Sequence, residues 1–477
     1  MAARFKKFSA FCATLLPHEI DYLLDIQQFE DVDRLEILRL IQKHQGVNHF
    51  PFDETIDKRK YSHLKNWISQ RLAEIDVDLS LKRLLSAEEA ILTDQITPLQ
   101  EKRLLKSLQT WDESFFYFVK WFEVLKVLRE DLQIRVRYEE VNILDGFLKK
   151  HRPAYERSVA VSQSIEQMTN EIIEQYQTLT GDTRHHIDSL SKTFRDESLD
   201  GYNRFKAFIR LIFIGFNYRD FDFLRPHFDY FDKLLTSGVS YSKRILLNYY
   251  SNRLLLHSRF REYQLAEKYG YLSIKVKNQD YLMYLNNLTA VLLRNHKYED
   301  ALRILQEGSK EAKETGSDHN KTGYVSFYVE TLNRLKRYRS AANHAAAFLS
   351  LYKREIFKYR WHFFFTVYIE ALIQQHRYKE INKVAKRYKL LDRDKQYSQR
   401  AGSTPIISWY ILIAQFEEGL IHKKQFNKRM GQHLTHYLSS LNDEQWSSMI
   451  AKINPFLPTD TKEVLYQIRE SHNEHHP

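Results

Sequence analysis

Residues 281–314 read YLMYLNNLTAVLLRNHKYEDALRILQEGSKEAKE, two apolar helical segments joined by a short polar turn. Leu288 and Leu292 recur at helical spacing before the turn, and Tyr298 and Leu305 continue the apolar pattern after it. Each segment has one apolar face and needs a neighbour to bury it. The stretch therefore predicts a helical hairpin.

The same pattern recurs through the second half of the chain. Phe260, Tyr298, Tyr338 and Tyr378 each follow a basic residue, and they are separated by 38, 40 and 40 residues. A period near 40 is typical of helical hairpins that stack on one another. We therefore predict an all-α fold, an α-solenoid of stacked hairpins. Its hairpins are expected at 242–272, 281–313, 323–352 and 362–391.

Composition agrees with a helical chain. The 477 residues include only 13 Gly and 9 Pro, and no proline occurs between Pro226 and Pro405. Helices can follow one another without interruption in that span. A polar stretch after Pro153 suggests a boundary. We expect an N-terminal helical domain at 1–155, bridging polar helices at 156–200, a repeat array at 201–455 and a C-terminal tail at 456–477.

Cysteine content and hydropathy indicate the compartment. Cys12 is the single cysteine, so the chain cannot form an internal disulfide, which suits a reducing environment. The first residues lack the apolar segment of a signal peptide, and the most apolar runs are too short to span a bilayer. We expect a cytoplasmic protein without membrane attachment.

The hairpin at 281–314 resembles the tetratricopeptide repeat. Leu288, Leu292, Tyr298, Ala301 and Leu305 occupy the packing positions of that motif, although its late proline is missing. The resemblance covers about 240–395 and implies a scaffold that binds protein or peptide partners. The chain is also similar to a group of uncharacterised helical-repeat proteins of the Bacteroidetes lineage. That similarity is carried by the phrases at 61–68 and 81–90.

The resemblance also implies a binding surface, because the first helix of each tetratricopeptide hairpin lines the concave face. Positions twelve, eight and four residues before each aromatic residue would then face a peptide. Asparagine can hydrogen-bond an extended backbone, and arginine can hold a carboxylate through two bonds. The expected groove residues are Asn248, Asn252, Asn286, Arg294, Ser326, Glu330, Arg334, Glu370 and Gln374.

Positive charge provides a second candidate surface. The segment from Thr331 to Arg400 holds 17 Lys and Arg but 5 Asp and Glu. We expect a basic rim outside the concave face, which could meet an acidic protein or nucleic-acid phosphates. Its residues are Lys353, Arg354, Lys358, Arg360, Lys379, Lys383, Lys386 and Arg387.

Catalytic motifs are not evident. The sequence contains no phosphate-binding glycine loop and no His-Glu-x-x-His helix. The pair His185-His186 beside a turn and the terminal histidines His472, His475 and His476 could hold a metal, but for the terminal group a surface tail is the simpler interpretation. We therefore predict a non-enzymatic scaffold without cofactor or metal that binds a protein or peptide through its concave face. The alternative is a nucleic-acid- or ribosome-associated repeat protein that uses the basic rim.

Overall fold

The computed structural model describes residues 3–44, 53, 55–178, 180–398, 403–438, 441 and 443–475. Their regular structure is entirely helical, and these residues contain no β-strand, which confirms the all-α prediction. The chain divides into two compact units, Met1–Arg261 and Glu262–Pro477. This division lies inside the array predicted for 201–455. Across the described ranges, no helix is both long enough and apolar enough to cross a bilayer.

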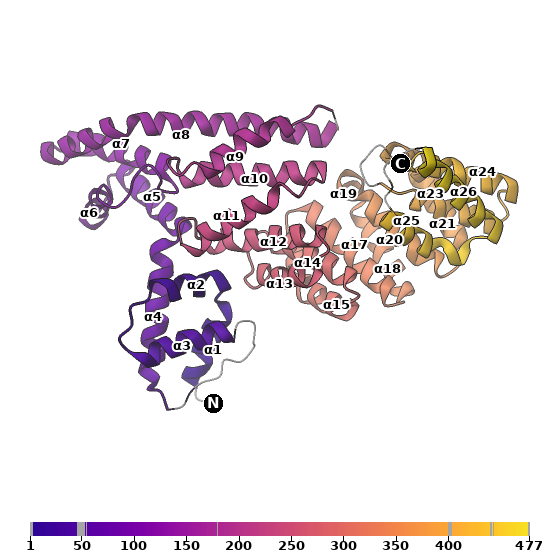
Figure 1. Cartoon of the computed structure of the whole chain (residues 1–477), viewed down its shortest axis with the longest axis horizontal. Helices are drawn as coiled ribbons and strands as arrows, with labels where there is room; N and C mark the ends of the chain where they lie inside the picture. Colours follow the sequence, from indigo (N-terminus) through magenta and orange to yellow (C-terminus); the bar gives the residue numbers. More distant parts are fainter. Residues whose placement is uncertain are drawn as a thin grey trace. The chain divides into compact units, whose positions relative to one another are not determined.

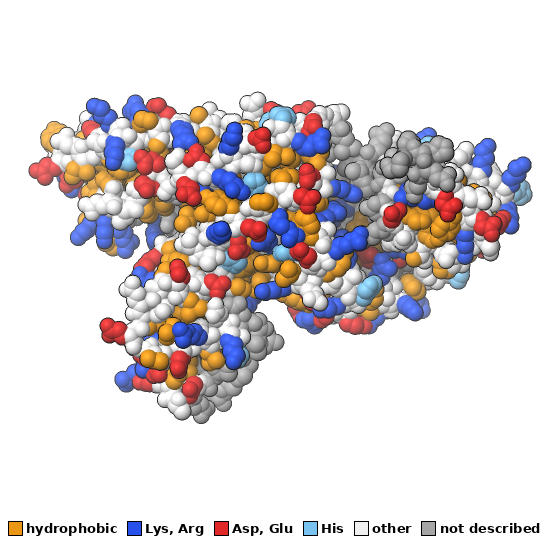
Figure 2. All heavy atoms as spheres, viewed as in Figure 1, with side chains coloured by type: hydrophobic (Ala, Val, Ile, Leu, Met, Phe, Trp, Pro, Cys, Tyr) orange, Lys and Arg blue, Asp and Glu red, His pale blue; other side chains and the backbone are white. Residues whose placement is uncertain are grey.

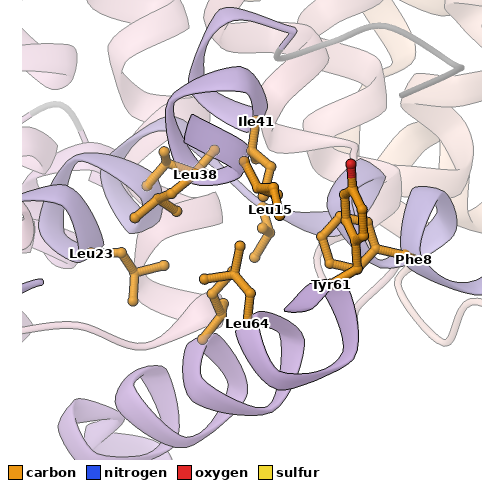
Figure 3. Packing of buried hydrophobic residues seen from close by; sticks show 10 residues of the cluster. Phe8, Leu15, Leu23, Leu38, Ile41, Tyr61 and Leu64 are labelled. Atoms are coloured by element: carbon orange, nitrogen blue, oxygen red, sulfur yellow. The ribbon is translucent and has the colours of Figure 1, made fainter. Parts of the chain in front are cut away.

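Unit 1 begins with four short helices that share one apolar cluster. Figure 3 shows this cluster, in which Phe8 of the first helix lies beside Tyr61 of the fourth. Their ring centroids are 5.2 Å apart, and the rings meet at 76°. The helices of unit 1 (Figure 1) are α1 (Ala3–Thr14), α2 (Pro17–Ile26), α3 (Val32–Lys43), α4 (Lys58–Ile75), α5 (Val77–Leu92), α6 (Pro98–Ser107), α7 (Phe118–Ile134), α8 (Tyr138–Thr178), α9 (Ile187–Arg195), α10 (Gly201–Tyr218), α11 (Leu224–Thr236) and α12 (Lys243–Arg259), with the 3₁₀ turn η1 (Arg184–His186) before α9.

The long helix α8 differs from the sequence prediction. It continues through Pro153, where we expected the first domain to end. The reason is a buried stripe that runs past the proline, from Val141 and Leu144 to Ile165 and Ile172. Pro153 itself is exposed, so its ring lies away from the packed side of the helix. Burial of the stripe therefore outweighs the usual cost of a proline inside a helix.

Unit 2 contains the helix pairs expected at 281–313, 323–352 and 362–391, whereas the pair expected at 242–272 is divided between α12 of unit 1 and Tyr263–Ser273 of unit 2. Helices α14, α17, α20 and α23 pack on one another in that order, and each of the first three is followed by a helix that begins at an aromatic residue. The helices of unit 2 are α13 (Tyr263–Ser273), α14 (Tyr281–Arg294), α15 (Tyr298–Glu307), α16 (Ser309–Glu314), α17 (Asp318–Arg334), α18 (Tyr338–Leu351), α19 (Lys353–Tyr359), α20 (Trp361–Ile373), α21 (Tyr378–Tyr388), α22 (Leu390–Tyr397), α23 (Ile406–Glu417), α24 (Lys423–Thr435), α25 (Asp443–Ile453) and α26 (Thr459–His475), with the 3₁₀ turn η3 (Asn454–Phe456) between the last two.

One turn geometry joins the helices of each hairpin. His296, Lys336 and His376 stand two residues before Tyr298, Tyr338 and Tyr378, and each adopts a left-handed φ between 54° and 58°. In the first hairpin the Lys297 N–H donates to the Leu292 carbonyl at 2.9 Å. The His296 N–H donates to the Leu293 carbonyl at 3.3 Å. This pair of bonds is the Schellman motif, which satisfies the last carbonyls of a helix.

The position of the left-handed residue shows that Phe260 was aligned wrongly with Tyr298, Tyr338 and Tyr378. The left-handed residue there is Arg261, and α13 begins at Tyr263. Tyr263 is thus the equivalent of Tyr298, and Phe260 is the C-terminal cap of α12. Unit 1 contains a further example that we did not predict, since Val136 is left-handed and Tyr138 begins α8.

The C-terminal segment is helical over most of the range in which we predicted a tail. Helix α26 covers Thr459–His475 and packs on α24. At the contact, a side chain at Gly431 would come within 2.8 Å of Ile468. The glycine therefore permits the close approach of the two helices. Residues 476 and 477 lie outside the described residues.

Candidate functional site

A groove of about 630 Å³ lies between α18 and α21, the second helices of two neighbouring hairpins. Leu349 on α18 and Val384 on α21 contribute apolar surface to its lining. Four predicted basic-rim residues line the same groove, namely Lys353, Lys379, Lys383 and Arg387. We call this feature the basic groove.

Three of the four cations of the basic groove share one helical face. Lys379, Lys383 and Arg387 follow one another at four-residue steps on α21, which places them side by side. Lys353 and Arg387 both approach the ring of Tyr388, at 5.6 and 5.7 Å from its centroid. These cation–π contacts orient the two charges without neutralising them.

Acidic residues do not balance these four charges. Within the parts of the chain that the structure describes, none of the four forms an ion pair. Glu380 is the one carboxylate among the described lining residues. It already accepts a bond from Arg377 at 3.0 Å and one from the Tyr368 hydroxyl at 3.2 Å. The groove therefore keeps a positive excess, although like charges at this spacing repel.

The other predicted rim residues lie elsewhere. Arg354, Lys358 and Lys386 are exposed but do not line the basic groove. The Nε atom of Arg360 lies 3.0 Å from Nε2 of His319, at the start of α17. The structure thus brings together four of the eight predicted rim residues.

Two uncharged residues of the predicted peptide groove are buried. The Nδ2 of Asn286 donates to the Asn320 carbonyl of the next hairpin at 3.0 Å, and the Ser326 hydroxyl donates to the Thr322 carbonyl at 2.8 Å. Both side chains therefore have roles in packing. Asn333 makes an equivalent bridge from α17 to the Val367 carbonyl of α20 at 2.9 Å, which the sequence did not lead us to expect.

The charged members of the predicted groove are engaged with other side chains. Arg334 donates to Glu330 on the same helix at 3.2 Å. Glu370 is buried and binds Lys452 of α25 at 2.8 Å. Arg294 is exposed and Gln374 is half-buried. Peptide binding at this face stays a prediction.

Asn248 and Asn252 lie on α12 in unit 1, whereas the other predicted groove residues belong to unit 2. The Nδ2 of Asn252 donates to both the carbonyl and Oδ1 of Asn248, each at 3.0 Å. Because Tyr263 replaces Phe260 in the alignment, the position equivalent to Asn286 is Ser251, which is also buried. Asn248 and Asn252 were therefore placed three residues out of register.

Other reactive side chains are held in structural contacts. Burial raises the pKa of the Cys12 thiol to about 12, so the thiol is protonated at neutral pH. His18, which is near Cys12 in sequence, lies 2.8 Å from the Tyr250 hydroxyl and 2.9 Å from Asp232. Farther along, the Ser408 hydroxyl donates directly to buried Asp394. A serine nucleophile would instead bond to a histidine.

Glu171 lies beside the sequence pair His185-His186. One ligand atom from each of the three residues lies within 4.8 Å of the others. His186 Nε2 lies 2.7 Å from Oε2 of Glu171, at hydrogen-bonding distance. The hydrogen bond with His186 lowers the pKa of the Glu171 carboxyl. Glu171 and His186 thus already contact each other at the junction of α8 and η1.

Comparison with protein-family models, with curated proteins and with solved structures found no match for this chain.

Proposed function

We propose that this protein is a non-enzymatic helical-repeat scaffold that binds an acidic segment of a partner protein in the basic groove. In this proposal the hairpins of unit 2 form an α-solenoid related in design to tetratricopeptide arrays. The observation that carries it is the set of four cations around an apolar lining, for which the described residues provide no ion-pair partner.

The chemistry of the lining favours a peptide over a nucleic acid. Phosphates would satisfy Lys353, Lys379, Lys383 and Arg387, but a phosphate chain gains nothing from Leu349 and Val384. A peptide that alternates acidic and apolar side chains would use both kinds of surface. The charges would attract the peptide and set its register, and apolar contact would add affinity.

The concave face is the weaker candidate for the same ligand. Asn286 and Ser326 are buried, and Glu370 is paired with Lys452. A peptide would have to displace these contacts, whereas the cations of the basic groove have no ion pair to break among the described residues. Exchange of existing bonds for new ones yields little net affinity.

Fluorescence anisotropy can test the proposal with three labelled probes. The first is a peptide of repeated Glu-Glu-Leu triplets, the second is a peptide of Glu and Ser with the same charge, and the third is a single-stranded RNA. We expect the Glu-Glu-Leu peptide to bind about tenfold more tightly than either other probe at 150 mM salt, a difference of ~1.4 kcal/mol. Equal affinity for both peptides would contradict a role for the apolar lining. Preference for RNA with a steep salt dependence would replace the proposal by the nucleic-acid alternative.

A further inference from the structure

A second pocket lies in unit 1, between α5 and α6, and has a volume of about 580 Å³. Leu84 and Ala87 of α5 and Leu104 of α6 form an apolar floor, and each is no more than 6% exposed. Trp111 closes one side, with its ring stacked on Phe115 at 3.9 Å between centroids. A pocket of this size and composition matches those that hold small organic ligands.

Four exposed cations surround this apolar floor. Lys82 and Arg83 extend from α5, and Arg103 and Lys106 from α6. Figure 2 shows Lys and Arg side chains gathered over the α6 region that Figure 1 locates. None of the described lining residues is acidic. Arg83 donates to the Ala73 carbonyl at 3.4 Å, and none of the four cations has an ion pair among the described residues.

Besides Asp76, whose charge interacts with that of Lys82, three nearby carboxylates are committed to other cations. They are held in three ion pairs, Glu88 with Lys120 at 2.7 Å, Glu101 with Arg137 at 3.1 Å and Asp78 with Arg244 at 2.8 Å. The pocket thus combines an apolar floor with four cations that form no ion pair among the described residues. A ligand that satisfies both must carry an anionic group and an apolar body.

We propose that the α5–α6 pocket binds a free anionic amphiphile, a molecule with one carboxylate or phosphate head and an apolar chain or ring. Arg83 and Arg103 stand on facing helices and would hold the head through charge-assisted bonds. The body would lie on Leu84, Ala87 and Leu104 against Trp111. This site is separate from the basic groove of unit 2, so either proposal can fail without the other.

Dansyl-undecanoic acid is a suitable probe, because dansyl fluorescence rises when the group leaves water. The intact chain is titrated with the acid and with its methyl ester. The acid is expected to bind saturably, and the ester about tenfold more weakly because it lacks the charge. Vesicles of anionic phospholipid form a separate arm that distinguishes a membrane surface from a free amphiphile.

Three variants assign the binding to the pocket. The double variant Arg83→Gln with Arg103→Gln should bind the acid about tenfold more weakly, because it loses two charge-assisted bonds to the head group. Ser86→Trp, which places a large ring at the pocket lining, should abolish saturable binding. Lys102→Gln with Lys149→Gln removes the same charge from exposed helix positions outside the pocket and should change the affinity less than twofold.

Some outcomes would overturn the proposal. Equal binding of acid and ester would contradict the role of the cations. An equal loss of affinity in both double variants would show that the net charge of the protein, and not Arg83 and Arg103 in particular, attracts the acid. Binding to vesicles without binding to the monomeric acid would assign the surface to a membrane. If Ser86→Trp lost helicity by circular dichroism, the comparison between the two double variants would still decide the proposal.

Discussion

At the scale of single residues, His227 offers a measurable titration. It lies on α11, is 7% exposed, and its Nε2 is 3.1 Å from the Ser191 hydroxyl. Burial, with a smaller contribution from the charge of Arg195, lowers its pKa from 6.5 to about 4. The folded protein therefore keeps this imidazole neutral at pH values where the unfolded chain takes up a proton.

This difference predicts a loss of stability in acid. Between pH 6.5 and pH 4 the unfolded chain binds more protons at this site, so the free energy of unfolding falls as the pH falls. Between pH 7.5 and pH 5 the free energy of unfolding of the natural chain should fall by ~2 kcal/mol more than that of a His227→Gln variant. Urea unfolding at the two pH values measures this difference. His63→Gln, at an exposed position of α4, is the matched control substitution. Parallel pH profiles for the natural chain and His227→Gln would contradict the prediction.

At the scale of elements, the inter-helix turn explains which parts of the fold the sequence could predict. The basic–aromatic pair before each second helix was visible, so Tyr298, Tyr338 and Tyr378 were correctly placed at helix starts. Phe260 follows Arg259 and so has the same basic–aromatic sequence, but the left-handed residue is Arg261, which lies after Phe260 instead of before it. Since these positions hold His, Lys or Arg instead of glycine, the sequence carried no backbone signal for the turn.

The left-handed turn residues also predict a stabilising substitution. Lys336 has φ 57°, a conformation in which its Cβ is sterically strained. Because the side chain is exposed, packing does not offset this strain. Lys336→Gly should raise the free energy of unfolding of unit 2 by ~0.5–1 kcal/mol. Lys428→Gly, at an exposed position inside α24, should lower it by ~1 kcal/mol. Urea titrations of both variants provide the measurement, and a loss of stability in Lys336→Gly would show that the turn does not need a glycine-like conformation.

At the scale of the whole molecule, the two compact units should respond to mutation separately. In unit 1 the Glu19 side chain is fully buried, and it binds Lys243 at 2.6 Å and accepts a bond from Tyr241. Glu19→Ala removes one partner of this buried cluster and should lower the free energy of unfolding of unit 1 by ~3 kcal/mol. Hydrogen exchange in the slowest helices of unit 1 should then accelerate about 100-fold, while unit 2 keeps its rates. Asp25→Ala, at an exposed position of the same helix, is the control. Equal acceleration in both units would contradict their independence.

The candidate site was predictable only in part. The charge excess of 331–400 and the four-residue steps of Lys379, Lys383 and Arg387 were visible in the sequence. Their assembly with Lys353 into one groove depends on how α18 packs near α21, which no local pattern encodes. The pairing of Glu370 with Lys452 joins residues 82 positions apart, so it could not be read from a repeat alignment.

One binding measurement compares the two candidate faces of unit 2 directly. The Glu-Glu-Leu peptide is titrated against two double variants that remove equal charge, Lys383→Gln with Arg387→Gln in the basic groove and Arg294→Gln with Arg334→Gln on the predicted concave face. We predict that the first pair of substitutions weakens peptide binding about tenfold or more and that the second pair weakens it less than twofold. Full affinity in the first pair together with a tenfold loss in the second would contradict it.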